Sequence, residues 1–189
     1  MQPLGVLGGT FDPVHNAHLA LARAALEALG LARILWVPTG DPPYREPPVA
    51  AARHRVAMLE LALAGETRYA IDRRELAPGA SGYTVDTLAA LRAELGPQTR
   101  LVLLMGADQY AKLETWHRWR ELFGLCEIAV FARPGWTISD RRARSVPHAP
   151  LEISASAVRE RIGRGEDVSA LLPAAVLAYI RRHRLYGHP

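Results

Sequence analysis

Short apolar runs alternate along the chain with longer stretches in which apolar residues recur every three or four positions. The short runs indicate buried strands, and the longer spacing is typical of amphipathic helices. On this basis strands are predicted at residues 4–7, 34–37, 69–71, 101–105 and 128–131. Helices are predicted at residues 17–29, 50–64, 84–95, 113–123, 157–162 and 173–185. Strands that alternate with helices predict βαβ units, in which the strands are parallel and the helices cover the sheet.

The predicted fold class is therefore α/β: a Rossmann-like, doubly wound parallel sheet with a C-terminal helical segment. No repeat or linker divides the 189 residues, so we expect one domain, residues 1–189. A chain of this size buries roughly 70% of its unfolded surface, and its 49% hydrophobic content is sufficient for such a core. The Gly/Pro-rich stretch 39–48 and the arginine-rich stretch 141–144 are predicted as loops.

The charge balance is mildly basic, with 23 Lys and Arg against 19 Asp and Glu and a formal net charge of +4. Lys112 is the only lysine, and it lies between Ala111 and Leu113. A P-loop, which needs a Gly-Lys-Ser/Thr sequence, is therefore excluded. The basic run 181–184 falls at the end of a predicted helix, where positive charge is favourable, and it lacks the interleaved aromatic residues of a single-strand-binding surface. We expect no nucleic-acid partner.

The chain has a single cysteine, Cys126, which excludes an internal disulfide and a CxxC metal or redox pair. Because it lies beside the apolar run 128–131, we expect a core residue rather than a nucleophile. Charged residues interrupt the apolar stretch 19–37, so it does not resemble a membrane span, and the N-terminus lacks the basic start of a signal peptide. We expect a cytoplasmic enzyme or binding protein with no membrane partner.

Candidate chemistry is concentrated after the first predicted strand, where residues 8–18 read GGTFDPVHNAH. In open α/β sheets, ligands bind at the carboxyl ends of the strands. Two glycines let the backbone approach an anion, and the helix that follows presents its positive end to phosphate. His15 and His18 are three residues apart at the start of that helix, so they project from the same face.

Each of these features has an ordinary explanation when taken alone. Paired glycines are common in turns, and an HxxH pair can belong to a helix surface or to half of a metal site. Zinc is disfavoured because the HExxH spacing is absent and no cysteine is nearby. The combination of strand, glycines, helix start and two histidines favours a phosphate-binding site.

Residues 8–18 resemble the signature of the nucleotidyltransferase superfamily that carries a T/HxGH motif. Members of that superfamily transfer a nucleoside monophosphate from a triphosphate and release pyrophosphate. Ala17 stands where the superfamily usually has glycine, and alanine is the smallest available substitute.

Other segments narrow the resemblance to the nicotinate-nucleotide adenylyltransferase family. Residues 81–88 resemble its SYTxDTL motif with one serine replaced by glycine, and residues 106–119 resemble its GADxxxxLxxWxxW segment. Residues 153–159 are similar to ISSTxIR, and the ending 172–186 also fits. The loop PPYR at 42–45 matches least, because the family commonly has PPHK there. The motifs occur in the family's order along the chain.

The resemblance implies transfer of the adenylyl group of ATP to nicotinate mononucleotide, giving deamido-NAD and pyrophosphate in NAD biosynthesis. It implies direct in-line attack without a covalent intermediate, with His15 and His18 as catalytic residues, and we expect at least one of them to be protonated in the ternary complex. The implied ATP-binding residues are Gly8, Gly9, Thr10, Phe11, Gly106, Asp108, Ser156 and Arg159. The implied substrate-binding residues are Arg45, Thr84, Trp116 and His117.

Some of these residues also have plain structural interpretations. Either Ser154 or Ser156 is suited to cap the helix that follows, and Asp108 is suited to the start of a helix after a strand. Trp119 is expected in the core. For Trp116 the resemblance implies stacking on the pyridine ring, with backbone N–H groups near Thr84 and His117 meeting the nicotinate carboxylate.

The implied partners are ATP and nicotinate mononucleotide, and a homo-oligomer is possible. Mg²⁺ is the implied cofactor, arriving with ATP; no carboxylate cluster marks a metal site, so no residue is assigned as a metal ligand. Two alternatives stay open: an adenylyltransferase for nicotinamide mononucleotide or another nucleotide, and a catalytically silent nucleotide-binding regulator. His15 in place of threonine, together with the 81–88 and 106–119 segments, argues against the phosphopantetheine branch. The presence of both histidines and Arg159 gives no support to loss of catalysis.

Overall fold

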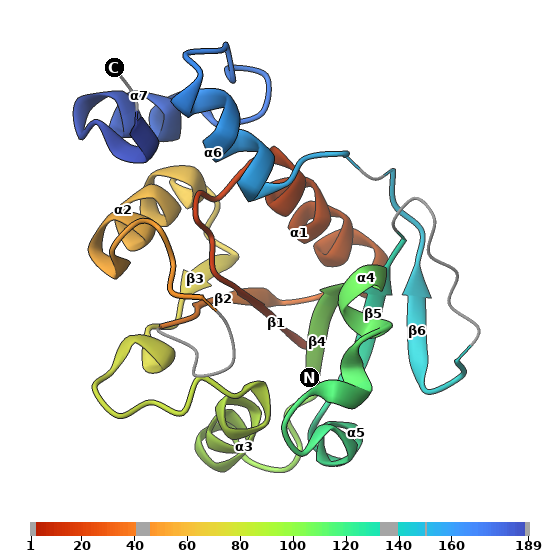
Figure 1. Cartoon of the computed structure of the whole chain (residues 1–189). Coiled ribbons are helices and arrows are strands. Elements are labelled where there is room, and N and C mark those ends of the chain that lie inside the picture. The colour runs from red at the N-terminus through yellow and green to blue at the C-terminus, as the bar shows by residue number, and fades with distance from the viewer. Residues whose placement is uncertain (1–2, 41–45, 133–139, 150, 188–189) are drawn as a thin grey trace.

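Among the residues that the structure describes, six strands form a single parallel sheet in the order β3-β2-β1-β4-β5-β6 (Figure 1). The computed structural model describes residues 3–40, 46–132, 140–149 and 151–187. The strands are β1 (Leu4–Gly9), β2 (Arg33–Pro38), β3 (Tyr69–Ile71), β4 (Leu101–Gly106), β5 (Glu127–Phe131) and β6 (Ala143–Val146). The chain adds β2 and β3 on one side of β1 and then returns to place β4 on the other side. The strand order therefore reverses between β1 and β4, as it does in doubly wound folds.

Helices cover both faces of this sheet. They are α1 (Asn16–Leu29), α2 (Ala52–Leu63), α3 (Thr84–Leu95), α4 (Ala107–Tyr110), α5 (Leu122–Leu125), α6 (Ala155–Gly163) and α7 (Ala174–Arg182). The first core joins one face of the sheet to α1, α2, α6 and α7, and the second joins the other face to α3 and α5 (Figure 1). The α/β class, the parallel sheet and the C-terminal helices are thus confirmed.

Each central strand supplies both cores, because successive side chains of a strand point to opposite faces. In β4, Leu103 belongs to the core under α3, whereas Leu104 belongs to the core under α1. All six residues of β4 are buried, which explains why this strand reads as a continuous apolar run rather than as an alternation.

Two helix termini follow the sequence signals. Helix α1 ends at Gly30, which adopts φ 60° and ψ 40°, a left-handed conformation that glycine tolerates, and its N–H bonds to the carbonyl of Leu26. Helix α6 begins after Ser154, whose Oγ accepts a hydrogen bond from the Ala157 N–H at 3.2 Å. Of the two candidate serines, Ser154 is therefore the cap.

The prediction of a helix at residues 113–123 is wrong. That stretch forms a 3₁₀ turn at Leu113–Thr115, a second at Trp119–Glu121 and then the one-turn α5. Between the two turns Trp116 is extended at φ −77° and ψ 146°, and Arg118 is left-handed at φ 51°. The apolar residues of this stretch reach the second core from separate short turns, and their spacing imitates one continuous helix.

The stretch 141–144, predicted as a loop, contributes to a sixth strand. Ala143–Val146 pairs in parallel with β5, from Ile128 opposite Ala143 to Phe131 opposite Val146. Only Val146 of this edge strand is fully buried, and Arg144 is exposed, so the hydrophobic pattern did not reveal it. Within the described part of the chain, no helix combines the length and the apolarity needed to cross a membrane.

Cys126 is expected to be chemically inert in the folded protein. Its sulfur lies 3.4 Å from the carbonyl oxygen of Leu122, and burial raises the pKa of the thiol to about 12. At pH 8 only about 1 in 10⁴ of the thiols would be ionised, and the thiolate is the reactive form. Ellman's reagent should therefore release no thionitrobenzoate on reaction with the native protein within minutes, and one equivalent per chain in guanidinium chloride. Rapid release of one equivalent from native protein would show that the prediction is wrong.

Candidate active site

The loop that follows β1 lies where the strand order reverses. β1 ends at Gly9 and the adjacent strand β4 ends at Gly106, so the glycine loop and the Gly106–Asp108 segment leave neighbouring strands at the same edge of the sheet. In doubly wound sheets this edge is where ligands bind. The fold thereby brings together two of the predicted ATP-binding segments.

The two glycines, which are the last residues of β1 before this loop, have different surroundings. Gly8 is exposed, and a Cβ built there meets nothing within 4 Å, so its backbone is open to a ligand. A Cβ at Gly9 would lie 3.0 Å from the ring of Phe11. Phe11 adopts a left-handed φ of 50° with its ring 2% exposed, so glycine at position 9 makes room for a ring that is fixed in the core.

His15 and His18 lie side by side, as their spacing predicted. His15 is the N-cap of α1, and its backbone N–H donates to Nδ1 of His18 at 3.2 Å. The two rings stack with centroids 3.7 Å apart and 23° between their planes. Because Nδ1 of His18 accepts this hydrogen bond, a neutral ring carries its proton on Nε2. Phe11 packs edge-on against His18 at 5.2 Å and fixes the ring from a third direction.

Arg159 reaches this loop from α6. Its Nη1 donates to the backbone carbonyl of Asp12 at 2.7 Å, which places the guanidinium against the loop that carries the histidines. Ser156 is exposed in the first turn of α6, with its Oγ 3.2 Å from that of Ser154. The structure therefore places Arg159 beside the glycine loop, and the phosphate roles of Ser156 and Arg159 remain predictions.

Arg55 is a site residue that the sequence interpretation missed. It comes from α2, its side chain is 1% exposed, and it donates to the carbonyls of Thr10 at 2.7 Å, Thr39 at 2.8 Å and Ala50 at 3.2 Å. It ties the loops after β1 and β2 together and adds a buried positive charge beside them. The sequence feature that could have identified Arg55 is its place on the apolar face of α2, three residues before the buried Met58.

Asp108 lies in the first turn of α4, directly after β4, and its Oδ2 accepts from Nε2 of Gln109 at 3.2 Å. A carboxylate at a helix start is electrostatically favourable, which agrees with the structural interpretation. Its place at the end of β4, next to β1, also suits the predicted contact with a nucleotide ribose, which remains a prediction.

The predicted nicotinate-binding segments meet on the other side of the site. Tyr83, which precedes Thr84 and α3, stacks on His117 with ring centroids 4.2 Å apart. Arg118 pairs with Asp86 of α3 at 3.0 Å. The start of α3 and the Trp116–His117 segment are thus fixed to each other, and Trp116 is half-buried against the second core. The remaining predicted substrate residue, at position 45, lies outside the described residues.

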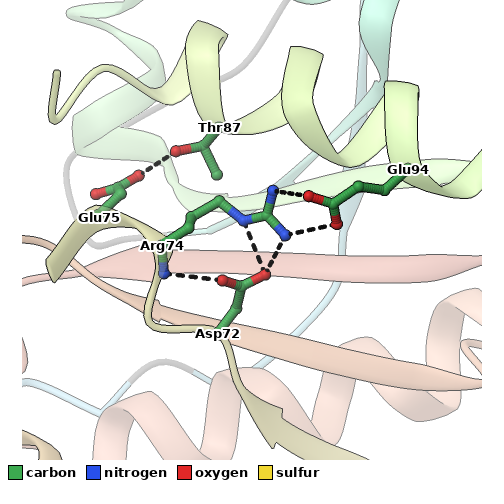
Figure 2. A network of polar contacts seen from close by, with 5 residues as sticks. All are labelled: Asp72, Arg74, Glu75, Thr87 and Glu94. Carbon is green, nitrogen blue, oxygen red and sulfur yellow. Dashed lines mark hydrogen bonds and ion pairs between the residues drawn. The ribbon is translucent and has the colours of Figure 1, made fainter. Parts of the chain in front are cut away.

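A polar network holds α3 against the end of β3 (Figure 2). Nη2 of Arg74 donates to Asp72 at 2.7 Å, and the same guanidinium makes two bonds to Glu94 of α3 at 3.0 and 3.1 Å. The hydrogen bonds to Asp72 and Glu94 raise the pKa of Arg74, so it stays charged. Thr87 of α3 donates to Glu75 at 2.6 Å. These bonds set the position of α3, whose first residue is Thr84.

Among the residues that the structure describes, no three His, Cys, Asp or Glu side chains gather closely enough to hold a metal ion. The charged groups nearest the histidine loop are engaged with backbone: Arg55 and Arg159 with carbonyls, and Asp12 with N–H groups.

A glycine loop with a histidine pair, placed at the reversal point of a 3-2-1-4-5-6 sheet, defines a Rossmann-like nucleotidyltransferase. In agreement, residues 6–161 match the cytidylyltransferase-like family. Relatives named probable nicotinate-nucleotide adenylyltransferase include those of Laribacter hongkongensis, 46% identical over 97% of this chain and 94% of the relative, and Dechloromonas aromatica, 42% identical over 98% of each. The chain belongs to the nicotinate-nucleotide adenylyltransferase family.

Solved structures support the same fold. The Plasmodium falciparum nicotinic acid mononucleotide adenylyltransferase complexed with NaAD superposes with a TM-score of 0.84 at 17% identity, covering 100% of this chain and 99% of that one. A putative nicotinate-nucleotide adenylyltransferase from Vibrio parahaemolyticus gives a TM-score of 0.76 at 14% identity, covering 100% and 98%. At these identities the likeness shows that the whole chain shares one architecture.

The bond from His15 N–H to His18 Nδ1 allows the structural and chemical roles of His18 to be separated. Asparagine at position 18 can place an oxygen near the Nδ1 position but has no donor near Nε2. We expect His18→Asn to keep the unfolding temperature of the parent within a few degrees and to lower kcat about 10²–10³-fold, the cost of one preorganised donor. His18→Ala should lose both the cap and the activity. The exposed His183→Ala variant is the control, and near-normal kcat in His18→Asn would contradict the assignment.

Proposed function

We propose that this chain transfers the adenylyl group of ATP to nicotinate mononucleotide, producing deamido-NAD and pyrophosphate, as a cytoplasmic enzyme of NAD biosynthesis. The observation that carries the proposal is the stacked His15–His18 pair beside an open glycine loop, in a chain of the nicotinate-nucleotide adenylyltransferase family. A phosphate oxygen of the mononucleotide attacks the α-phosphorus of ATP, a new P–O bond forms, and the bond to the β-phosphate breaks. Pyrophosphate leaves with the bonding electrons, and no covalent enzyme intermediate forms.

The residues around the histidine loop act by positioning and by neutralising charge. Negative charge accumulates on the equatorial and leaving oxygens of the transition state, so fixed donors there accelerate transfer. We assign three groups to the triphosphate: Nε2–H of His18, the side chain of His15, and the backbone of residues 8–11. Ser156 and Arg159 would reach the same phosphates from α6. The buried guanidinium of Arg55 adds positive potential without touching the substrate.

The segments joined by the Tyr83–His117 stack would hold the second substrate. The indole of Trp116 offers a flat face to the pyridine ring, and the backbone N–H groups of Thr84 and His117 offer neutral donors to its carboxylate. The arginine nearby, Arg118, is neutralised by Asp86 and Glu121 at 3.0 and 2.6 Å. Discrimination of acid from amide would therefore rest on N–H groups, which match a carboxylate oxygen and oppose an amide NH₂.

Magnesium would enter with ATP. Mg²⁺ usually keeps several waters and binds substrate phosphates with one or two carboxylates, and it needs no cage of protein ligands. Asp108 follows β4 at the edge of the sheet where the adjacent strand β1 also ends, and we assign it to the ribose of ATP rather than to a metal. When bound, the ion would neutralise phosphate charge.

Pyrophosphate release tests the function directly. Purified protein is incubated with ATP, Mg²⁺ and one mononucleotide, and pyrophosphate is measured through inorganic pyrophosphatase. We expect turnover with nicotinate mononucleotide, a much lower kcat/KM with nicotinamide mononucleotide, and none with phosphopantetheine. Equal rates with the acid and the amide would refute the substrate assignment, and ATP binding with no turnover of any acceptor would identify a regulator.

Trp116→Ala is expected to raise the KM for nicotinate mononucleotide at least tenfold and to change the KM for ATP less than twofold. The physical reason is that the indole face would stack on the pyridine ring only, and a base–aromatic stack contributes roughly 1–3 kcal/mol. Trp119→Phe is the matched control, because Trp119 packs edge-on against Phe123 and beneath Arg120 instead. Equal increases in both KM values for Trp116→Ala would count against the stacking role.

A further inference from the structure

A buried carboxylate holds the loop that carries the histidines. Asp12 lies three residues before His15 and is 3% exposed. Its Oδ2 accepts from the Val49 N–H at 2.7 Å, and its Oδ1 accepts from the Ala50 N–H at 3.2 Å. The third donor is the hydroxyl of Tyr186, 2.7 Å from Oδ1. None of the three donors belongs to the loop itself.

Tertiary contacts hold Tyr186 in place against its local backbone preference: it packs against the first core, and its hydroxyl contacts Asp12. Its φ of 60° and ψ of 29° lie in the left-handed region, which costs a non-glycine residue about 1–2 kcal/mol. Burial and the hydrogen bond to Asp12 raise the pKa of the hydroxyl well above its usual range. The hydroxyl therefore stays protonated at any working pH, and it donates a hydrogen bond to Asp12.

The position of Asp12 is transmitted to both predicted catalytic histidines. Only Pro13 and Val14 separate it from His15, and both are buried, with Val14 fully enclosed. His15 in turn orients His18 through the bond to Nδ1. The backbone carbonyl of Asp12 also receives Nη1 of Arg159 at 2.7 Å. A shift of Asp12 would thus move His15, His18 and Arg159 together.

We propose that Tyr186 and Asp12 are positioning residues for adenylyl transfer. The hydroxyl of Tyr186 holds the carboxylate of Asp12, and Asp12 in turn holds the loop that carries His15 and His18. The proposal rests on the proposed function for its kinetic consequence, and on geometry alone for its structural one. Neither side chain is assigned to substrate. A displacement of the reacting groups by about 1 Å can cost on the order of 100-fold in rate, so a single lost hydrogen bond here should be visible in kcat.

Tyr186→Phe removes the hydroxyl and keeps the ring. We expect kcat to fall about tenfold, with both KM values within threefold of the parent and an unfolding temperature within a few degrees of it. The matched control is Tyr179→Phe, also near the C-terminus, whose hydroxyl lies 3.0 Å from Nδ1 of His54. It should leave kcat unchanged. A parental kcat in Tyr186→Phe, or an equal loss in Tyr179→Phe, would overturn the proposal.

A double-mutant cycle tests whether Tyr186 acts through Asp12. If it does, Asp12→Asn combined with Tyr186→Phe should lose no more kcat than the poorer single variant, because both changes break the same link. Multiplicative losses would mean that the two residues act independently. The cycle also covers the case in which one of the single variants is poorly folded, since Asp12→Asn tests the carboxylate without altering the tyrosine.

Histidine spectra separate this proposal from the function itself. In ¹⁵N-histidine-labelled protein, long-range ¹H–¹⁵N correlations report the ring environment of the seven histidines without any substrate. Tyr186→Phe should shift or broaden the signals of His15 and His18, and Tyr179→Phe should shift that of His54 instead. Unchanged His15 and His18 signals in Tyr186→Phe would refute the positioning role even if the enzyme proves active. Shifted signals with no turnover in the parent would leave the contact supported and refute the function.

Discussion

The architecture of the site depends on the buried guanidinium of Arg55. A charged group in the core is tolerated only when its hydrogen bonds are made, and each bond from a charged donor contributes about 1.5–3 kcal/mol. Arg55 directs its donors to carbonyls that follow two adjacent strands and to Ala50. The N–H of Ala50 donates to Asp12, so Ala50 bridges the buried guanidinium of Arg55 and the buried carboxylate of Asp12. These hydrogen bonds fix the loops after β1 and β2 relative to the sheet.

Much of this molecule could be predicted from its sequence, because its central features are periodic or local. Fully buried parallel strands such as β4 read as apolar runs, and α1 carries its stop signal at Gly30. The proximity of His15 and His18 followed from helical spacing alone. The pairing of the Thr84 and Trp116 segments could not be derived in this way; it was implied by the family resemblance, and the Tyr83–His117 stack now gives it a physical basis.

What the sequence did not reveal depends on partners far along the chain. Strand β6 is defined by its pairing with the edge of β5. Its exposed Arg144 gives no hydrophobic signal. The stretch 113–123 has helical spacing but is divided at Arg118, which is left-handed. Asp12 appeared only as one letter of a motif, since its role depends on Tyr186. A carboxylate that accepts backbone N–H groups has no local pattern by which it could be found.

The contact between Asp12 and Tyr186 spans 174 positions of sequence. Ribosomes add roughly 5–20 residues per second, so about 9 to 35 s pass between synthesis of the two partners. During that interval β1, α1 and the histidines can be formed while the carboxylate still lacks its last donor. A nascent or prematurely ended chain would thus carry the histidine loop without this hydrogen bond. The order of translation itself therefore makes this hydrogen bond one of the last contacts of the histidine loop that can form.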